Sequence, residues 1–415
     1  MRDKQHKIQI FKFGMYGFLK NLRFYEPYLL YYFTIISGLS LFQVGILYSI
    51  REIIIYLVEI PSGVIADRYG KKLELVFCFL FYILSFSIFF LAGQFYLFVI
   101  GMILFGLGEA FRSGTHKAMI MQYLDMHEIK DSKTKVYGGT RSMSMLGSMT
   151  MSLISIIFVI WLPEVRYLFL ISIIPYALDL MLIVSYPKYL NHAESKKFIF
   201  KEFIHENIRS IRYSFRNRSV RKLLFEASTY QSSFKSIKDY IQPIILTMSM
   251  SIILFTKFTL DENLKIYIGI IYAFIYLISS FASRNAYKVV ERYNTRNVLT
   301  VTWLLTGIIM IILAFFLNSI FVVFFIFVLF YIFLNIRRPL MVELVGNASE
   351  PSRRASVLSI ESQMTSLLTA ISAPIIGFIA DRSMQLLFIL VGIIMMLFYI
   401  YNLYFSTHKK QTKIS

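Results

Sequence analysis

Ionisable and polar side chains stand inside several long apolar runs of this sequence. Glu26 follows Arg23 and precedes Pro27, and the similar run around Pro243 carries Gln242. An ionisable group in apolar surroundings is costly to keep charged and is usually retained because it has a function. A buried carboxylate can take up and release a proton near neutral pH. We therefore expect the functional site among the following residues: Glu26, Glu109, Arg112, Arg141, Lys235, Asp239 and Gln242.

The spacing of the charged residues leaves their roles open. Glu109 and Arg112 are three residues apart, and Lys235 and Asp239 are four apart, so each pair shares one face of a continuous helix. Each pair either neutralises itself as a structural ion pair or presents a charge to a ligand. Glu26 has three alternatives, namely proton coupling, contact with a substrate or a structural role, and we favour proton coupling.

Residues for hydrolytic, nucleotide-dependent or metal chemistry form no motif. Cys78 is the single cysteine, and His116, Asp125, His127 and Glu128 lie close in sequence without the spacing of a metal site. The sequence has no Walker loop and no nucleophile with a matching base. It therefore predicts a protein that is not an enzyme and that holds no cofactor and no metal.

The composition indicates that lipid is the solvent for most of the chain. Of the 415 residues, 57% are hydrophobic and 16% are charged, whereas a soluble domain carries about 25% charged residues. The net charge of +19 has a simple source, because membrane proteins concentrate Lys and Arg in cytoplasmic loops. We therefore do not expect nucleic acid as a partner.

The apolar runs predict an all-α integral membrane protein with twelve transmembrane helices, since each run approaches the roughly 20 residues that cross a bilayer. The predicted spans lie near 18–38, 42–62, 73–93, 96–117, 139–161 and 166–187, and near 223–254, 264–285, 297–317, 319–342, 355–380 and 384–405.

A polar segment divides these spans into two groups of six. We expect an N-terminal bundle over 1–187, a linker over 188–222 and a C-terminal bundle over 223–415. The linker holds ten Lys and Arg residues, and its pattern predicts an amphipathic helix lying on anionic lipid. With both termini inside, 34 Lys and Arg lie in inner segments and 4 in outer loops, so both termini are predicted to be cytoplasmic in a multi-pass protein of the cell membrane.

The segment after the second span carries the most specific pattern in the chain. It reads Gly63-Val64-Ile65-Ala66-Asp67-Arg68-Tyr69-Gly70-Lys71-Lys72. This resembles the signature loop of the major facilitator superfamily, G-x-x-x-D-R-x-G-R/K-K/R, in sequence and in position. Gly63 would allow a neighbouring helix to approach closely, and Gly70 would permit a tight turn. Arg68 and Lys71 would keep the segment inside.

The resemblance implies two pseudo-symmetric six-helix bundles that alternate access to a site between them. It also implies that Asp67 braces the cytoplasmic end of span 11, and that spans 1, 4, 7 and 10 line the cavity. A similar string over 377–382 ends span 11, but our orientation places it outside the cell. The two halves also match each other, since 24–27 resembles 240–243 and 109–112 resembles 335–338.

These patterns predict a monomeric secondary active transporter. We favour proton-coupled export of a small polar or charged organic solute, by antiport. The alternatives are uptake of a nutrient or metal chelate and, from another class, a membrane sensor built on a transport fold.

Overall fold

The computed structural model describes residues 2–113, 115–127, 133–191, 200–248, 255–350 and 354–411. These residues form helices joined by short turns, with no strand among them, which confirms the predicted all-α class. Ten of the helices are long and apolar enough to cross a membrane. Spans 1 and 7 are each made of shorter helical segments, and together with the ten long helices they give the twelve predicted spans.

The first half of the chain contains the first six spans. Span 1 comprises α1 (Arg2–Lys20), η1 (Glu26–Tyr28), α2 (Leu29–Tyr31) and η2 (Tyr32–Ile36). Spans 2 to 6 follow as α3 (Leu41–Tyr69), α4 (Lys71–Leu91), α5 (Phe95–Arg112), α7 (Lys133–Trp161) and α8 (Tyr167–Val184), with the shorter α6 (Thr115–Met126) after α5.

The linker and the second half follow the same plan. The linker contains η4 (Lys188–Asn191) and α9 (Phe200–Arg216). Span 7 comprises α10 (Arg218–Ile237) and α11 (Ile241–Met248). Spans 8 to 12 are α12 (Leu260–Arg292), α13 (Thr295–Phe315), α14 (Ile320–Ala348), α15 (Arg354–Arg382) and α16 (Met384–Gln411).

Span 1 differs from the sequence-based prediction in its start and in its continuity. The prediction began at 18, but α1 begins at Arg2 and ends at Lys20, and the chain is not helical again until Glu26. Pro27 lies at the start of η1, and because proline has no backbone N–H it cannot continue the α-helical hydrogen bonding from the residues before it. The side chain of Asn21 donates to the Gly17 carbonyl across 2.7 Å, which satisfies one of the freed acceptors at the end of α1. Lys20 therefore lies along the span and not before it.

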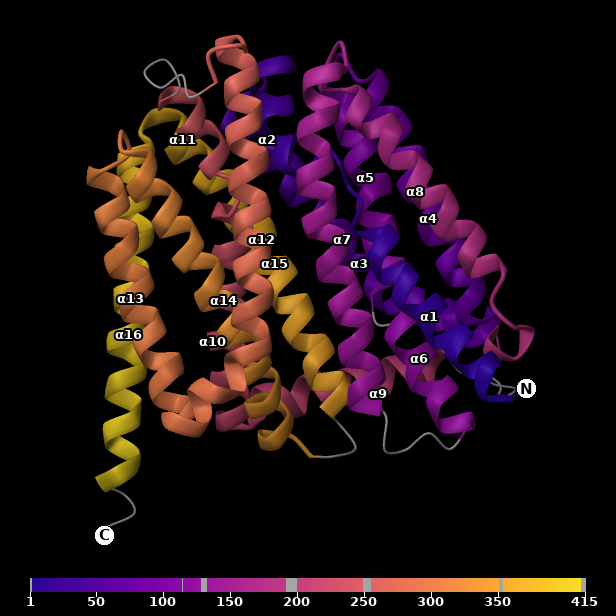
Figure 1. Cartoon of the computed structure of the whole chain (residues 1–415). Coiled ribbons are helices and arrows are strands. Elements are labelled where there is room, and N and C mark those ends of the chain that lie inside the picture. The colour runs from indigo at the N-terminus through magenta and orange to yellow at the C-terminus, as the bar shows by residue number, and fades with distance from the viewer. Residues whose placement is uncertain are drawn as a thin grey trace.

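Two groups of helices lie side by side, and both chain termini lie at one end of the molecule (Figure 1). We call this end, which holds the start of α1, the helix α9 and the end of α16, the terminal face. The opposite end, which holds 37–40, 255–259 and 381–383, is the far face. The halves meet where α3 packs on α15 and where α7 packs on α12.

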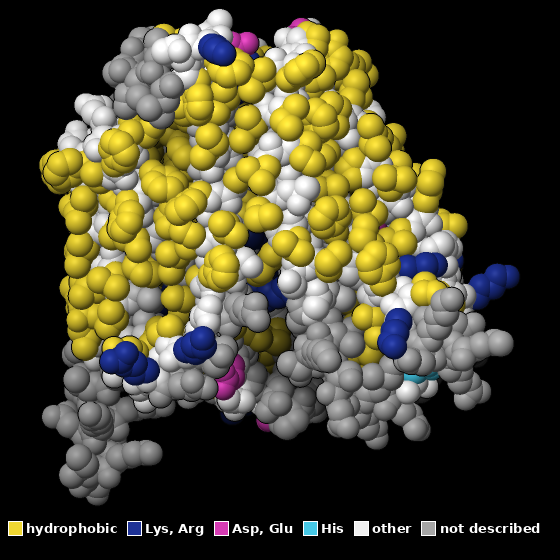
Figure 2. All heavy atoms as spheres, in the orientation of Figure 1, with side chains coloured by type: hydrophobic (Ala, Val, Ile, Leu, Met, Phe, Trp, Pro, Cys, Tyr) yellow, Lys and Arg dark blue, Asp and Glu magenta, His cyan; other side chains and the backbone are white. Residues whose placement is uncertain are grey.

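Apolar side chains cover the sides of the molecule in a broad band, and the basic side chains visible in this view lie mainly toward the terminal face (Figure 2). Between the halves the surface is hollowed, and basic side chains are visible at depth (Figure 2). A protein immersed in lipid shows this pattern, since charge is tolerated at the interfaces or in an interior that excludes lipid.

The described faces allow a direct test of the predicted orientation. Ser219 is exposed at the terminal face and Thr256 is exposed at the far face. In a Cys78→Ser background, Thr256→Cys should react with an impermeant thiol reagent added to intact cells, because the basic terminal face is predicted to lie in the cytoplasm. Ser219→Cys should react only after the cells are lysed. Reaction of Ser219→Cys in intact cells, with Thr256→Cys protected, would reverse the orientation.

Candidate functional site

The breaks in spans 1 and 7 place polar side chains inside the bundle at corresponding positions of the two halves. The first break covers 21–25, and the second covers 238–240, between Ile237 at the end of α10 and Ile241 at the start of α11. Each break is followed within a few residues by a proline, Pro27 or Pro243. The sequence match between 24–27 and 240–243 therefore corresponds to a shared structural feature. Non-helical backbone at this depth is tolerated only where protein or a water-filled cavity surrounds it.

Glu109 of α5 holds two arginines in the first half. Its Oε1 accepts from Arg23 across 2.7 Å and its Oε2 from Arg112 across 2.5 Å. Arg23 also donates to the Tyr176 hydroxyl, and its guanidinium lies 5.3 Å from the centre of the Tyr82 ring. The predicted Glu109–Arg112 pair is present, and the break in span 1 adds Arg23 to it. Two cations on one carboxylate leave this cluster with an excess positive charge.

Glu52 of α3 joins the two halves. It is 1% exposed, and it accepts from Arg51 on its own helix across 2.9 Å and from Lys235 on α10 across 3.1 Å. The expected alternative of an ion pair between Lys235 and Asp239 is wrong. The i,i+4 rule requires a continuous helix, and α10 ends at Ile237. Asp239 instead pairs with Lys238 across 2.8 Å.

Gln242 connects the two breaks. Its Oε1 accepts from the backbone N–H of Tyr31 across 3.0 Å, and its Nε2 donates to the Tyr272 hydroxyl across 3.0 Å. The Tyr272 hydroxyl donates in turn to Asp239 across 3.2 Å. Gln242 is completely buried, so its amide is used in tying span 1 to span 7.

Glu26 stands apart from these clusters. Among the described residues its carboxylate has no ion pair and no hydrogen bond. Tyr48, Tyr276 and Tyr331, from α3, α12 and α14, are within electrostatic range of it. The hydroxyls of Tyr48 and Tyr331 are buried and have no hydrogen-bond partner. A free carboxylate and unpaired hydroxyls from both halves form a set that can bind a proton or a polar ligand.

The far face is closed by contacts between α3 and α15. The backbone N–H groups of Leu41 and Phe42 each donate to the carboxylate of Asp381 across 2.8 Å. A Cβ added at Gly45 would clash with the backbone of Ala373, and one at Gly377 with the backbone of Leu41. The Tyr31 hydroxyl also donates to Asp261 across 2.6 Å. The string over 377–382 therefore lies at the far face, as expected, and there it caps the start of α3.

The signature segment lies at the terminal face and is mostly helical. Residues 61–69 continue α3, and only Gly70 leaves the helix, with a φ of 101° that favours glycine. Lys71 begins α4 and donates to Gln122 across 2.9 Å. The side chains of Asp67 and Arg68 lie outside the described residues.

Gly63 differs from its expected role. A Cβ built there meets no atom within 4 Å, so no helix packs closely on it in this conformation. The glycines that α3 and α15 use for close approach are Gly45 and Gly377 at the opposite end. Arg141 is exposed at the terminal face and donates to Ser283 of α12 across 3.2 Å. It therefore lies away from the central residues with which the sequence grouped it.

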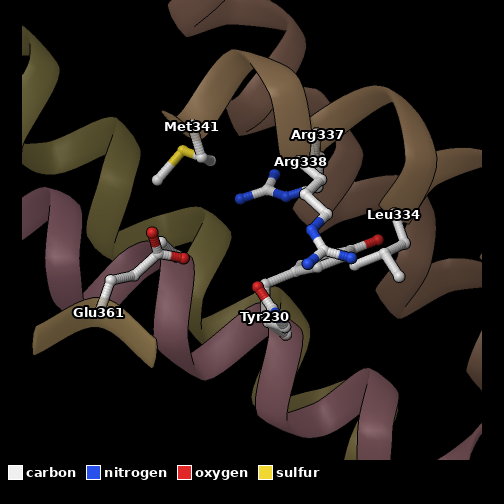
Figure 3. Close-up of a pocket in the computed structure, with 8 residues that line it drawn as sticks. Tyr230, Leu334, Arg337, Arg338, Met341 and Glu361 are labelled. Carbon is white, nitrogen blue, oxygen red and sulfur yellow. The ribbon is translucent and has the colours of Figure 1, made fainter. Parts of the chain in front are cut away.

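A small pocket in the second half lies between α10, α14 and α15. Glu361 lies across it from Arg337 and Arg338 (Figure 3). Arg337 is 2% exposed and is held by Glu226 across 3.4 Å and by the Tyr230 ring 4.1 Å from its guanidinium carbon. The sequence match between 109–112 and 335–338 aligns Arg112 with Arg338, whereas the arginine held in an ion pair in the second half is its neighbour Arg337.

Comparisons with known proteins agree with this architecture. The family model described as Major Facilitator Superfamily matches residues 16–282 and 240–415, so the two matches together cover most of the chain. The chain belongs to the Major Facilitator Superfamily. It is therefore a multi-pass membrane protein of a transporter family.

Individual relatives add detail to the fold. An uncharacterized MFS-type transporter, YxaM of Bacillus subtilis (strain 168), is 34% identical over 73 residues, a match that covers 18% of each chain. The crystal structure of the nucleoside transporter NupG superposes with a TM-score of 0.77 at 11% identity, covering 95% of this chain and 98% of that one. The peptide transporter POT in complex with sulfate gives a TM-score of 0.72 at 13% identity, covering 96% and 94%. These structures show the shared fold.

The far-face cap generates a prediction about conformation. Spin labels at the exposed positions Gln94 and Asn318 report the far-face separation of the halves by pulsed electron paramagnetic resonance. Asp381→Ala removes a helix cap worth about 0.5–2 kcal/mol, so the fraction of long distances should rise.

Glu262→Ala is the matched control. Glu262 caps α12 through Thr259 at the same face, but within one half. Its loss should leave the distance distribution unchanged. Equal distributions in Asp381→Ala and the unsubstituted protein would show that the cap does not hold the far face closed.

Proposed function

We propose that this protein is a proton-coupled secondary transporter of a small polar or charged organic solute, that it works by alternating access, and that Glu26 is its coupling carboxylate. The observation that carries the proposal is the unpaired carboxylate of Glu26, which lies among tyrosines of both halves. Glu52, Glu109 and Asp239 already have cationic partners. A group that must gain and lose a proton cannot be held permanently ionised by a fixed counter-ion.

The unpaired hydroxyls of Tyr48 and Tyr331 support a polar solute. In a site closed to water, such groups gain hydrogen bonds only when a ligand supplies them. Lys235 and Arg112 retain partial exposure, with side chains 32% and 30% accessible, and we propose that they meet an anionic or polar group of the solute. We propose that the solute is exported by antiport with protons, that both termini are cytoplasmic in the cell membrane, and that one chain carries the whole cycle.

Flux into proteoliposomes tests the coupling role of Glu26. We would screen nucleosides and short peptides first, because two similar structures are named as transporters of these solutes. For a transported solute, Glu26→Gln should abolish flux driven by a proton gradient and preserve exchange at equal pH, since it keeps the shape and removes the titration.

Glu164→Gln is the control, because Glu164 is a partly exposed acid that pairs with Arg166 between α7 and α8. It should behave as the unsubstituted protein. Gradient-driven accumulation in Glu26→Gln proteoliposomes would assign the coupling role to another residue. If flux through the unsubstituted protein does not depend on the proton gradient, the proposal of proton coupling is wrong.

We also propose that Asp67 braces the terminal face when the far face is open. Asp67→Ala should then shift the population toward the far-closed conformation by about 1–3 kcal/mol, the usual size of a conformational coupling. The distance between labels at Gln94 and Asn318 would measure this shift. An unchanged distribution, in a protein that keeps its thermal stability, would contradict the brace.

A further inference from the structure

Asp179 of α8 is a buried acid that the proposed coupling site does not use. It is 0% exposed, and neither of its carboxylate oxygens has a hydrogen-bond partner. It lies five residues before the end of α8 at Val184, which places it about 8 Å along the helix from that end. Glu109 and Glu52 are also buried acids of the first half, but each holds two cations.

Titratable groups from several helices surround Asp179, and none neutralises it by direct contact. Lys20 of α1 is the charged neighbour within electrostatic range. The buried hydroxyl of Tyr16, also on α1, has no hydrogen-bond partner. Around them lie Cys78 on α4, His116 on α6 and Tyr186 after α8.

The two arginines and the histidine of this region are already engaged. Arg23 and Arg112 both bind Glu109. His116 stacks on the Tyr16 ring at 3.5 Å, and its Nε2 contacts the Tyr186 hydroxyl across 3.2 Å. The Tyr16 hydroxyl and Lys20 remain in this region, but among the described residues no donor forms a hydrogen bond with either carboxylate oxygen of Asp179 in this conformation.

An ionised carboxylate without hydrogen bonds is far more costly inside a protein than the neutral acid. We propose that Asp179 is a second proton-binding site, which carries its proton in the far-closed conformation and releases it to water when Lys20 comes into contact. Lys20 is the last residue of α1 before the break in span 1, so movement of that break changes its distance from Asp179. The release is a simple acid dissociation, in which the carboxylate formed takes Lys20 as its counter-ion.

Part of this inference rests on the proposed function, since a role for Asp179 in coupling needs a proton-driven transporter. The proton site itself does not, and it can be tested without a substrate. Infrared spectroscopy of the purified full chain in liposomes detects the carbonyl stretch of a protonated carboxylic acid, which shifts when the sample is exchanged into heavy water.

At neutral pH the unsubstituted protein should show such a band, and Asp179→Asn should lose the component of the band that Asp179 contributes. Glu164→Gln, which alters a partly exposed acid, should keep the band unchanged. In Lys20→Met the band should persist to higher pH than in the unsubstituted protein, because the cation that favours the carboxylate is gone. This second variant keeps the acid itself and so tests the site even if Asp179→Asn folds poorly.

Thermal stability gives an independent readout. Asp179→Asn replaces one neutral group by another and should melt near the unsubstituted protein, whereas Glu109→Gln strands two arginines and should melt clearly lower. The proposal would be overturned if Asp179→Asn removed no part of the infrared band seen in the unsubstituted protein. It would also be overturned if the band titrated in Lys20→Met as it does in the unsubstituted protein. Failure to find a transported solute would count against the proposed function and leave this result standing.

Discussion

The ion pair between Glu52 and Lys235 is the contact on which the arrangement of the two halves depends. Charges inside a membrane protein must meet a partner, and a pair that crosses between rigid bodies fixes how those bodies sit. Glu52 comes from the middle of α3, and Lys235 comes from the last turn of α10, beside the break in span 7. Among the described residues the other ion-pair clusters inside the bundle lie within one half, around Glu109 in the first and Glu226 in the second. Those clusters stiffen each bundle, and the cross-half pair orients one bundle against the other.

The helix breaks explain how these side chains can reach one another. A continuous helix would commit the backbone groups of 21–25 and 238–240 to its own hydrogen bonds. Breaking it frees them, and a side chain from another span satisfies one of them: Ser172 accepts from the Phe24 N–H across 3.0 Å. Beyond the first break, Gln242 accepts from the Tyr31 N–H and ties span 1 to span 7. The breaks also carry charged residues of the candidate site, Arg23 and Asp239.

The sequence predicts the span count, the polar linker with a helix in it and the correspondence of the halves, because these depend on composition and local pattern. It does not predict partners that are distant along the chain. Lys235 shows why. Its four-residue spacing from Asp239 predicts an ion pair between them, but because the helix is broken, Lys235 pairs with Glu52 of the other half instead. Gly63 shows a second limit, because a sequence motif does not indicate in which conformation of the protein its contacts form. The cap that Asp381 provides for α3 has a visible sequence signal, the repeated Asp-Arg string, but its partner lies 340 residues away.

The closing of the two ends is unequal in this conformation. At the far face, α3 and α15 are in backbone contact through Gly45 and Gly377, and Asp381 caps α3. At the terminal face, a Cβ added at Gly63 would meet no atom of another helix within 4 Å among the described residues. If the protein alternates access, as we propose, each end must pass through both conditions during the cycle.

A double-mutant cycle on this pair tests the account most directly. The far-face distance between labels at Gln94 and Asn318 would be measured in the unsubstituted protein, in Glu52→Gln, in Lys235→Gln and in the double variant. If the pair orients the halves, the two single changes are not additive, and the populations yield a coupling energy of about 0.5–3 kcal/mol. Strictly additive effects, with no coupling between Glu52 and Lys235, would contradict the account.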